Sequence, residues 1–406
     1  MTTTDRAPIR SWETDFDHGH PDYAARAPEI WDELRESCPI AHSDRYGGTW
    51  LPVRHDDVSE ISKDTDHFSS VGVLVGDYRP EPSDAPVGFA PPITSDPPFH
   101  QIARRFLLPV FAPKAIERLE GSTRALCNGL LDEIEAGIRS SGSPLVDASA
   151  QFTQHIPVRV IAKMLGVPEE DGDRFRGFIH RILETPGVAH GVDPEDTLAA
   201  YLERMIAARR EHPADDLITE MINSEIDGEP LTADHLQGTV ALLLLAGIDT
   251  TWSAIGASLW HLAQHPDHRR RWIDDPDVRP FAIEEFLRFY APVTMARIVA
   301  EDIELSGCPM KQGDWVLLPF PAANRDPAVF DRADEFIIDR AENRHGAFGL
   351  GIHRCVGSNL ARLELTIAIE TWMERFPDFE LTDPDAVRWS TGQIRGPREL
   401  PVRITT

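Results

Sequence analysis

The segment Ala347–Gly357 reads AFGLGIHRCVG and places a single cysteine among three glycines, a histidine and an arginine. The next residues, SNLARLELTIAIETWMERF, carry apolar side chains at helical spacing. Cys355 therefore stands at the start of a predicted helix, where the positive helix end favours a thiolate by about 0.3 to 1 kcal/mol. Several kinds of chemistry use a lone thiol in such a place.

Four interpretations of Cys355 compete. The commonest outcome for a lone cysteine is a small buried side chain. A catalytic nucleophile needs a general base, and His353 would point elsewhere in most backbone conformations, although a histidine distant in sequence could serve. Structural zinc needs four ligands, and none cluster here; Cys38, Cys127 and Cys308 are too scattered for a CxxC pair. A single thiolate ligand to haem iron needs only one cysteine and a large apolar cavity.

Composition disfavours several classes of function. The chain has 406 residues, 41% hydrophobic and 26% charged, with no linker of distinct composition, so we expect one unit over residues 1–406 with residues 1–15 as a flexible N-terminus. Forty Lys and Arg against 67 Asp and Glu give a net charge of −27, which disfavours nucleic acid and anionic lipid as partners. The N-terminus lacks a secretory pattern, and no window reaches the roughly 18 apolar residues of a membrane span. We expect a cytoplasmic protein.

Helical periodicity dominates the sequence, and strand-like stretches are short. The clearest strands are residues 49–54 (TWLPVR) and Trp315–Phe320 (WVLLPF). Residues 298–318 have the pattern of a hairpin that turns through Gly307 and Gly313. We therefore expect a mainly α (α+β) fold with small accessory sheets.

A proline-rich segment lies between Tyr78 and Pro98, where seven prolines exclude regular helix. On sequence alone a surface connection is the commoner outcome for such a segment. The alternative is a loop that overlies a ligand pocket, because long irregular loops in compact domains are often functional.

A helix of 34 residues is predicted from Thr232 to His265, and at about 1.5 Å per residue it would span roughly 50 Å. Its centre, Val240–Ala246, is apolar on every side, yet Gly247, Asp249 and Thr250 follow directly. Glycine costs about 1 kcal/mol in a helix interior and a buried unpaired carboxylate costs more, so another interaction must offset them. A threonine hydroxyl that bonds back to a carbonyl one turn earlier can open a bulge there. A kinked core helix with a satisfied aspartate is the alternative.

Three motifs occur together in the order known from one family. FGLGIHRCVG resembles the haem-ligand signature of the cytochrome P450 monooxygenases, Phe-x-x-Gly-x-x-x-Cys-x-Gly, at Phe348, Gly351, Cys355 and Gly357. AGIDTT (residues 246–251) is similar to the family's oxygen-activating segment, and EEFLR (residues 284–288) contains its Glu-x-x-Arg pair as Glu285 and Arg288. SDPPFHQIARR (residues 95–105) and AANRDPAVF (residues 322–330) extend the resemblance over nearly the whole chain.

The resemblance implies the cytochrome P450 fold, a triangular-prism helical domain that holds haem b (iron protoporphyrin IX) between two long helices. It implies that Cys355 is the axial metal ligand. The implied cofactor-binding residues are His100, Arg104, Ala246, Arg297, Phe348, Gly351, His353, Cys355 and Gly357. Four of these would pair with the two haem propionates, because buried carboxylates need cationic partners: His100, Arg104, Arg297 and His353. Glu285 and Arg288, with Arg340 as a third member, would form a buried ion pair that braces the cysteine loop.

On the other side of the haem the resemblance implies a proton relay and a substrate pocket. Thr250 would be the catalytic alcohol that holds a water, and Asp249 would deliver protons from solvent; positioned proton transfer contributes typically about 10²- to 10⁴-fold. The implied substrate-binding residues are Leu242, Leu245, Val293 and Met295. The implied reaction inserts one oxygen atom from O₂ into a small apolar organic substrate.

No flavin or ferredoxin domain accompanies the sequence, so we expect electrons to come from a separate ferredoxin and an NAD(P)H-dependent ferredoxin reductase. Four arginines around the cysteine segment could steer such an acidic partner: Arg340, Arg344, Arg354 and Arg362. The alternatives are a haem-thiolate peroxygenase and a non-catalytic haem ligand sensor, against which the Asp249–Thr250 pair argues. A cysteine hydrolase, the last alternative, would be colourless.

Overall fold

The computed structural model describes residues 7–76, 78–81, 89–179, 181–182, 193–226 and 228–405. Its α-helices are α1 (Pro21–Ser37), α2 (His55–Lys63), α3 (Phe99–Arg105), α4 (Leu107–Val110), α5 (Pro113–Glu117), α6 (Glu120–Ser141), α7 (His155–Leu165), α8 (Gly172–Ile179), α9 (Leu198–Glu211), α10 (Leu217–Ile222), α11 (Ala233–Gln264), α12 (Pro266–Asp274), α13 (Arg279–Phe289), α14 (Phe320–Ala323) and α15 (Ser358–Arg375). Short helical turns are η1 (Arg45–Gly47), η3 (Ser149–Thr153), η4 (Glu169–Asp171), η6 (Pro194–Asp196), η7 (Pro276–Val278), η8 (Gly351–His353) and η9 (Pro384–Ala386).

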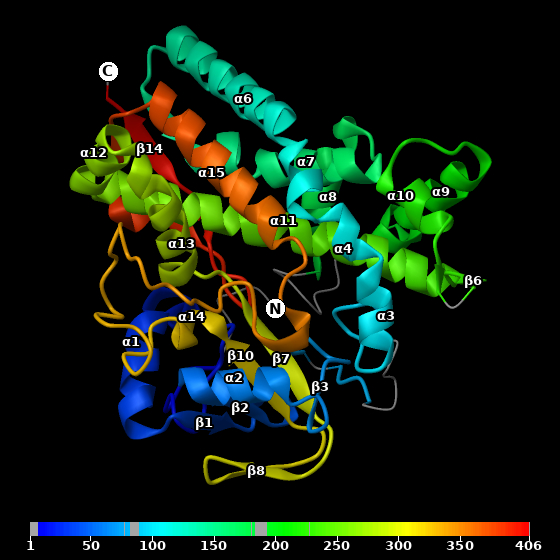
Figure 1. Ribbon diagram of the computed structural model, residues 1–406. Helices are drawn as coiled ribbons and strands as arrows, with labels where there is room; N and C mark the ends of the chain where they lie inside the picture. The colour runs from blue at the N-terminus through cyan, green and yellow to red at the C-terminus, as the bar shows by residue number, and fades with distance from the viewer. Residues whose placement is uncertain are drawn as a thin grey trace.

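The strands are short, as the sequence predicts. They are β1 (Ile40–Ser43), β2 (Thr49–Pro52), β3 (Phe68–Ser69), β4 (Leu145–Asp147), β5 (Glu225–Ile226), β6 (Glu229–Pro230), β7 (Thr294–Val299), β8 (Ile303–Leu305), β9 (Cys308–Met310), β10 (Trp315–Pro319), β11 (Phe379–Leu381), β12 (Arg388–Trp389), β13 (Pro397–Glu399) and β14 (Pro401–Ile404). In Figure 1 most helices gather above α11, which crosses the molecule, and the largest sheet lies below it.

The largest sheet among the described residues has the order β1-β2-β10-β7-β3. The two strands expected near residues 49 and 315 are therefore neighbours in it, and they run parallel with Trp315 opposite Thr49. The expected hairpin is also present: β8 and β9 pair around Gly307, and after Gly313 the chain returns as β10, antiparallel to β7. Both glycines have positive φ, which explains why glycine occupies these turns. The mainly helical fold with small sheets is confirmed.

The long helix α11 is unbroken over residues 233–264. Thr232 caps its N-terminus, where its side chain accepts a 3.2 Å hydrogen bond from the backbone N–H of His235. Gly247 lies at the crossing with α7, and a Cβ there would sit 3.3 Å from a side-chain carbon of Ile161. The glycine is therefore explained by close helix packing, and the expected bulge is absent from this helix.

By length and composition α11 is able to cross a membrane, because one 18-residue window has a mean hydropathy of 1.6. Our expectation that no window would reach this level is wrong. In the protein 67% of that window is buried against other elements, including α7, α9 and α15. Its apolar surface is therefore accounted for by the core.

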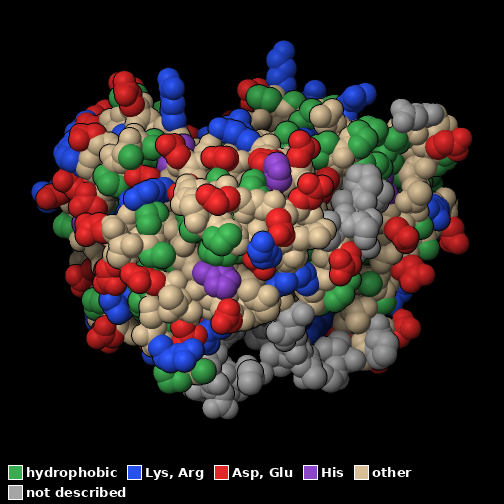
Figure 2. Space-filling view, turned by 90° about the horizontal axis from the view of Figure 1, so that it is seen from below, with side chains coloured by type: hydrophobic (Ala, Val, Ile, Leu, Met, Phe, Trp, Pro, Cys, Tyr) green, Lys and Arg blue, Asp and Glu red, His purple; other side chains and the backbone are tan. Residues whose placement is uncertain are grey.

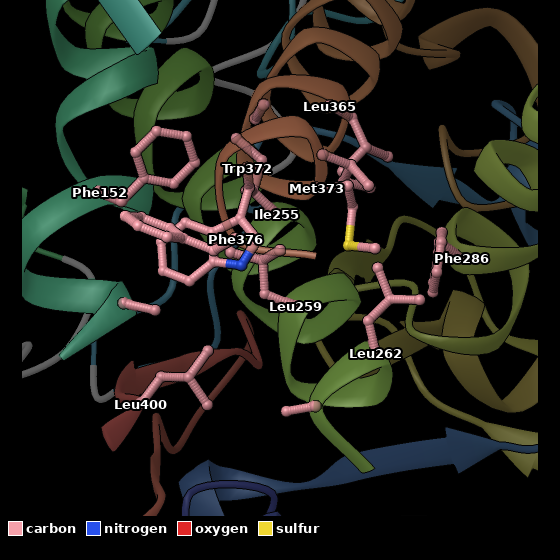
Figure 3. Close-up of a cluster of buried hydrophobic side chains, with 14 of the residues drawn as sticks. Phe152, Ile255, Leu259, Leu262, Phe286, Leu365, Trp372, Met373, Phe376 and Leu400 are labelled. Atoms are coloured by element: carbon pink, nitrogen blue, oxygen red, sulfur yellow. The ribbon is translucent and has the colours of Figure 1, made fainter. Parts of the chain in front are cut away.

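One part of the core lies between α11 and α15 and fixes the position of one helix against the other. Ile255, Leu259 and Leu262 of α11 face Leu365 and other side chains of α15, as Figure 3 shows. The same cluster reaches Phe152 of η3, Phe286 of α13 and Leu400, which lies between β13 and β14 (Figure 3). Burial of side chains of this size contributes about 1.5 to 3 kcal/mol each, so this packing stabilises the contact between α11 and α15, the helix that follows Cys355.

The N-terminal segment, which we expect to be flexible over residues 1–15, makes side-chain contacts with the rest of the protein at its end. The carboxylate of Asp15 is buried and accepts hydrogen bonds from Arg10 and Arg45 at 3.1 and 3.0 Å. Residues 1–6 lie outside the described part of the chain. On the face seen in Figure 2, acidic side chains are spread across the surface, in keeping with the charge of −27.

Candidate functional site

The cysteine loop ends in η8 and turns directly into α15. The backbone N–H of Cys355 donates a 2.7 Å hydrogen bond to the carbonyl of Phe348, which closes the loop. The Cys355 side chain is free and accessible. Desolvation raises the pKa of its thiol, whereas the backbone N–H of Gly357 and nearby arginines act in the opposite direction and favour the thiolate. The thiol is therefore a free ligand atom in a partly protected position.

Glycine is required at position 351 for a local reason. Gly351 has φ of +70°, and a Cβ there would collide with the backbone carbonyl of Ser62 at the end of α2. The loop thus packs directly on α2. At Gly357 a Cβ would lie 3.8 Å from the Cys355 sulfur, so its absence leaves that side of the sulfur open.

Two histidines meet beside this loop. The rings of His100, from α3, and His353, from η8, have centroids 4.3 Å apart. His353 contacts the hydroxyl of Ser70 at 2.8 Å, whereas neither ring nitrogen of the buried His100 has a hydrogen-bond partner. Desolvation and the charges of Arg104 and Arg297 lower the pKa of His100 to about 4 and that of His353 well below its usual value.

The two arginines of this group come from different elements. Arg104 lies one turn after His100 on the same face of α3, and it donates to the backbone carbonyl of Arg354. Arg297, in β7, is buried and donates a 2.7 Å hydrogen bond to the carbonyl of the preceding residue. Burial lowers the pKa of Arg297 to about 10, and the nearby carboxylate of Asp96 opposes this effect. Buried positive charge of this kind usually has an anionic partner.

His100, Arg104, Arg297 and His353 therefore form one group, which we call the cationic cluster. It combines buried positive charge with two unpartnered ring nitrogens and lies next to an accessible thiol. A ligand that offers carboxylates to the cluster and a metal ion to the sulfur satisfies all of these groups. Haem has both features, and the residues present fit it.

Thr250 and Asp249 are neighbours on α11, but their side chains point in different directions. The Thr250 hydroxyl donates a 2.8 Å hydrogen bond to the carbonyl of Ala246 one turn earlier, and both residues line a cavity. Asp249 is fully buried and is not part of that lining. Its carboxylate accepts a 2.6 Å hydrogen bond from Arg398, which begins to explain why a carboxylate is tolerated in this apolar helix.

Arg398 is a functional candidate that the sequence did not reveal. It lies in β13, and its guanidinium also donates to the hydroxyl of Ser253 at 3.0 Å and stacks over the ring of Trp252 at 4.3 Å. The only sequence signal is that a buried acid needs a cationic partner, and this partner is far away along the chain.

The cavity has a volume of about 870 Å³ and lies between α11, the start of β7 and the proline-rich segment. Met295 lies two residues before Arg297 in β7, so alternation places both on the same face of the strand. All the expected substrate-binding residues line the cavity: Leu242, Leu245, Val293 and Met295. The structure therefore brings the substrate candidates together with Thr250.

The proline-rich segment contributes to the cavity wall, as expected for a loop that overlies a pocket, and is not only a surface connection. Its described residues that line the cavity are Tyr78, Pro80, Phe89, Ala90, Ile93 and Thr94. The carbonyl of Pro91 accepts a 2.9 Å hydrogen bond from Thr239 of α11, which fixes the segment over the helix. Gln237, Asp234, Gln393 and Ile394 also line the cavity and were missed, because no local pattern distinguishes them.

The Glu-x-x-Arg pair forms a buried ion-pair network. Arg288 donates to both carboxylate oxygens of Glu285 at 2.8 Å, and neither side chain is exposed. Arg340 adds hydrogen bonds of 3.1 and 3.2 Å to the same carboxylate. Arg288 also donates to the carbonyls of Asn324 and Glu335, so the network ties α13 to the chain that leads to the cysteine loop.

One of the four arginines expected on a docking surface does not lie on the surface. Arg340 is buried in the network described above, and Arg362 is paired with Glu284 at 2.6 and 2.8 Å. Arg344 and Arg354 are exposed. The expectation is therefore wrong for Arg340, whose charge is already balanced by a buried carboxylate.

Comparison with known families agrees with this geometry. The cytochrome P450 family model matches residues 178–275 and 280–390, which include Thr250, the Glu285–Arg288 pair and Cys355.

Curated relatives and solved structures match nearly the whole chain. The mycinamicin IV hydroxylase/epoxidase of Micromonospora griseorubida is 33% identical, over 92% of this chain and 94% of its own. The nocardicin C N-oxygenase of Nocardia uniformis is 34% identical, over 94% and 95%. The structure of the cytochrome P450 PksS of Bacillus subtilis has a TM-score of 0.84, 30% identity and coverage of 96% and 100%. That of CYP109E1 from Bacillus megaterium in complex with testosterone has a TM-score of 0.83, 28% identity and coverage of 95% and 99%.

Proposed function

The chain belongs to the cytochrome P450 family, and we propose that it oxidises a bulky, largely apolar organic compound. It is a monooxygenase of this family with haem as its cofactor. The observation that carries the proposed substrate class is the cavity of about 870 Å³, most of whose lining side chains are apolar. Apolar cavities of this volume are typical of binding sites for drug-sized organic ligands.

We propose that Cys355 would ligate the haem iron and that the cationic cluster would bind the two propionates. The bound haem would supply the reductive activation of dioxygen. The protein's task is to keep the thiol deprotonated, exclude water and deliver protons. The backbone N–H of Gly357 and the charge of Arg104 serve the first of these tasks.

Thr250 is the proposed catalytic alcohol. Because its hydroxyl proton is directed to the Ala246 carbonyl, its oxygen remains free to accept a hydrogen bond from a water in the cavity. Asp249, held by Arg398, is the proposed group that passes protons from the protein side toward this water. The proposed proton relay therefore uses polar groups of α11. The side of α11 that faces the cavity also presents Leu242 and Leu245 to the substrate.

The relatives support a large natural-product type of substrate. The names of two of them refer to mycinamicin IV and nocardicin C, and one solved neighbour is in complex with testosterone. We propose a compound of this size class, whose few polar groups are oriented by Gln237 and Asp234 in the cavity lining. Hydroxylation, epoxidation and dealkylation share the same residues of the site.

Electron supply is proposed to come from a ferredoxin and an NAD(P)H-dependent ferredoxin reductase in the cytoplasm, with the 406 residues acting as one haem domain. Arg344 and Arg354 are the exposed cations nearest in sequence to the cysteine and would face an acidic partner.

The test is turnover of candidate compounds by the haem-loaded protein. Steroids and macrolides are screened for a low- to high-spin change, and those that respond are incubated with NAD(P)H, ferredoxin, reductase and isotopically labelled dioxygen. The proposal predicts one labelled oxygen atom in a hydroxylated or epoxidised product, or in the carbonyl fragment that a dealkylation releases. Product without label, or product formed only with added hydrogen peroxide, would overturn it in favour of peroxygenase chemistry.

A further inference from the structure

Three histidines meet at the junction of α11 and α12, remote from the cysteine loop in sequence. They are His261 near the end of α11, His265 at its C-cap and His268 in α12. One ring nitrogen from each lies within 4.8 Å of the other two. We propose that this triad binds one divalent transition-metal ion of the zinc class, which imidazole ligands suit.

The ligand geometry is close to what zinc requires. The Nε2 atom of His261 and the Nδ1 atom of His268 are 2.8 Å apart. Two nitrogens at about 2.0 to 2.1 Å from a tetrahedral ion stand about 3.3 Å apart, so these rings need to separate by only about 0.5 Å. His265 lies one helical turn after His261, the spacing at which two histidines share one ion.

The surroundings orient the most buried ligand. The other ring nitrogen of His261, Nδ1, lies 2.7 Å from the hydroxyl of Tyr290, the kind of outer contact that fixes the ring of a metal ligand. The ring of Phe336 lies 4.0 Å from that of His261 and supplies an apolar wall. His265 is exposed, so an ion can enter from solvent, and water can occupy the fourth position.

Basic neighbours on α12 do not oppose a cation strongly, because each has a partner. Arg269 lies 3.9 Å from the carboxylate of Asp378, Arg270 pairs with Asp267 and Arg271 pairs with Asp275. Each of these guanidinium groups therefore has a carboxylate partner.

The expected consequence is structural. His261 lies eleven residues after Thr250, or about 16 Å along the helix axis, so the ion would not take part in the reaction. It would link the end of α11 to α12, and through Tyr290 to the end of α13. This site is independent of the proposed function.

The test is calorimetric titration of ZnCl₂ into tag-free, metal-stripped holoprotein. The proposal predicts one equivalent of zinc and a higher Tm when zinc is present. His265→Ala, at an exposed position, should abolish this binding and the Tm increase, whereas His212→Ala, an exposed histidine outside the triad, should change neither. Tyr290→Phe should weaken binding by about 10- to 100-fold. X-ray absorption at the zinc edge should show three nitrogen neighbours at about 2.0 Å.

Absence of saturable binding of one equivalent overturns the proposal. Equal zinc affinity of the parent protein and His265→Ala also overturns it, because the ion would then bind elsewhere, for example at surface thiols.

Discussion

The guanidinium of Arg398 donates a 2.6 Å hydrogen bond to the buried carboxylate of Asp249. The two residues lie in β13 and α11, and the contact brings a cation to the acid that precedes Thr250. Because a buried carboxylate without cationic partners is costly, this contact is one reason why α11 can carry an acid at its centre.

We expect Arg398→Ala to lower the yield of product per NAD(P)H and to destabilise the fold by about 1 to 3 kcal/mol, the usual cost of leaving a buried polar group without a partner. Haem content should be retained. The measurement compares NAD(P)H oxidation, product and hydrogen peroxide. Arg388→Ala, at an exposed position on the neighbouring strand β12, is the control and should leave all three unchanged. Unchanged coupling in Arg398→Ala would contradict a role in the relay.

We expect Thr250→Ala to keep its haem and to divert electrons to hydrogen peroxide, because the cavity then loses the hydroxyl that holds a water. Product formation should fall by up to about 10²-fold. Thr250→Ser retains the hydroxyl and should recover most of the coupling. Equal coupling in the alanine variant and the parent protein would exclude the proposed role of this alcohol.

Removing a member of the buried ion-pair network should be strongly destabilising. Arg288→Ala leaves the Glu285 carboxylate with less compensation, and we expect a loss of about 3 to 5 kcal/mol in the free energy of unfolding. The exposed pair Lys311–Asp302 provides the contrast, since Lys311→Ala should cost no more than about 1 kcal/mol. Urea unfolding measures both. Similar losses for the two variants would show that the network is not a brace.

The pairing of Glu284 with Arg362 predicts a pH dependence. Although desolvation raises the pKa of Glu284, hydrogen bonds from Arg362 and His345 outweigh it, and the pKa falls from 4.5 to about 2. A lowered pKa in the folded state stabilises the protein above the unfolded-state value, and this contribution is lost as the pH falls. The stability difference between the parent protein and Glu284→Gln should therefore be full at neutral pH and should shrink between pH 4.5 and about 2. A difference that grows in acid would contradict the pairing.

Local patterns in the sequence were enough to predict several features. The helical spacing of residues 232–265, the turns at Gly307 and Gly313, and the position of Cys355 before a helix all depend on neighbours in the chain. The cationic cluster was accessible only through the family resemblance, because its members come from three separate elements.

Other features depend on contacts between distant segments. Arg398 reaches Asp249 from near the end of the chain, and Gly247 is explained by Ile161 of α7, so neither relationship leaves a local signal. The proline-rich segment had two possible roles, and only its hydrogen bond from Thr239 and its place in the cavity lining distinguish them. The sequence pattern does not indicate the histidine triad, because its members lie on both sides of the end of α11, where the helical periodicity stops.

The central claim is that the Cys355 thiolate ligates the haem iron, and the spectrum of the reduced carbon monoxide adduct tests it most directly. The account predicts a strongly red-shifted Soret band for the parent protein and its loss in Cys355→Ser, while Cys308→Ser, at another accessible thiol, retains it. A parent protein that folds without haem, or a Cys355→Ser variant that keeps the red-shifted band, would contradict the claim.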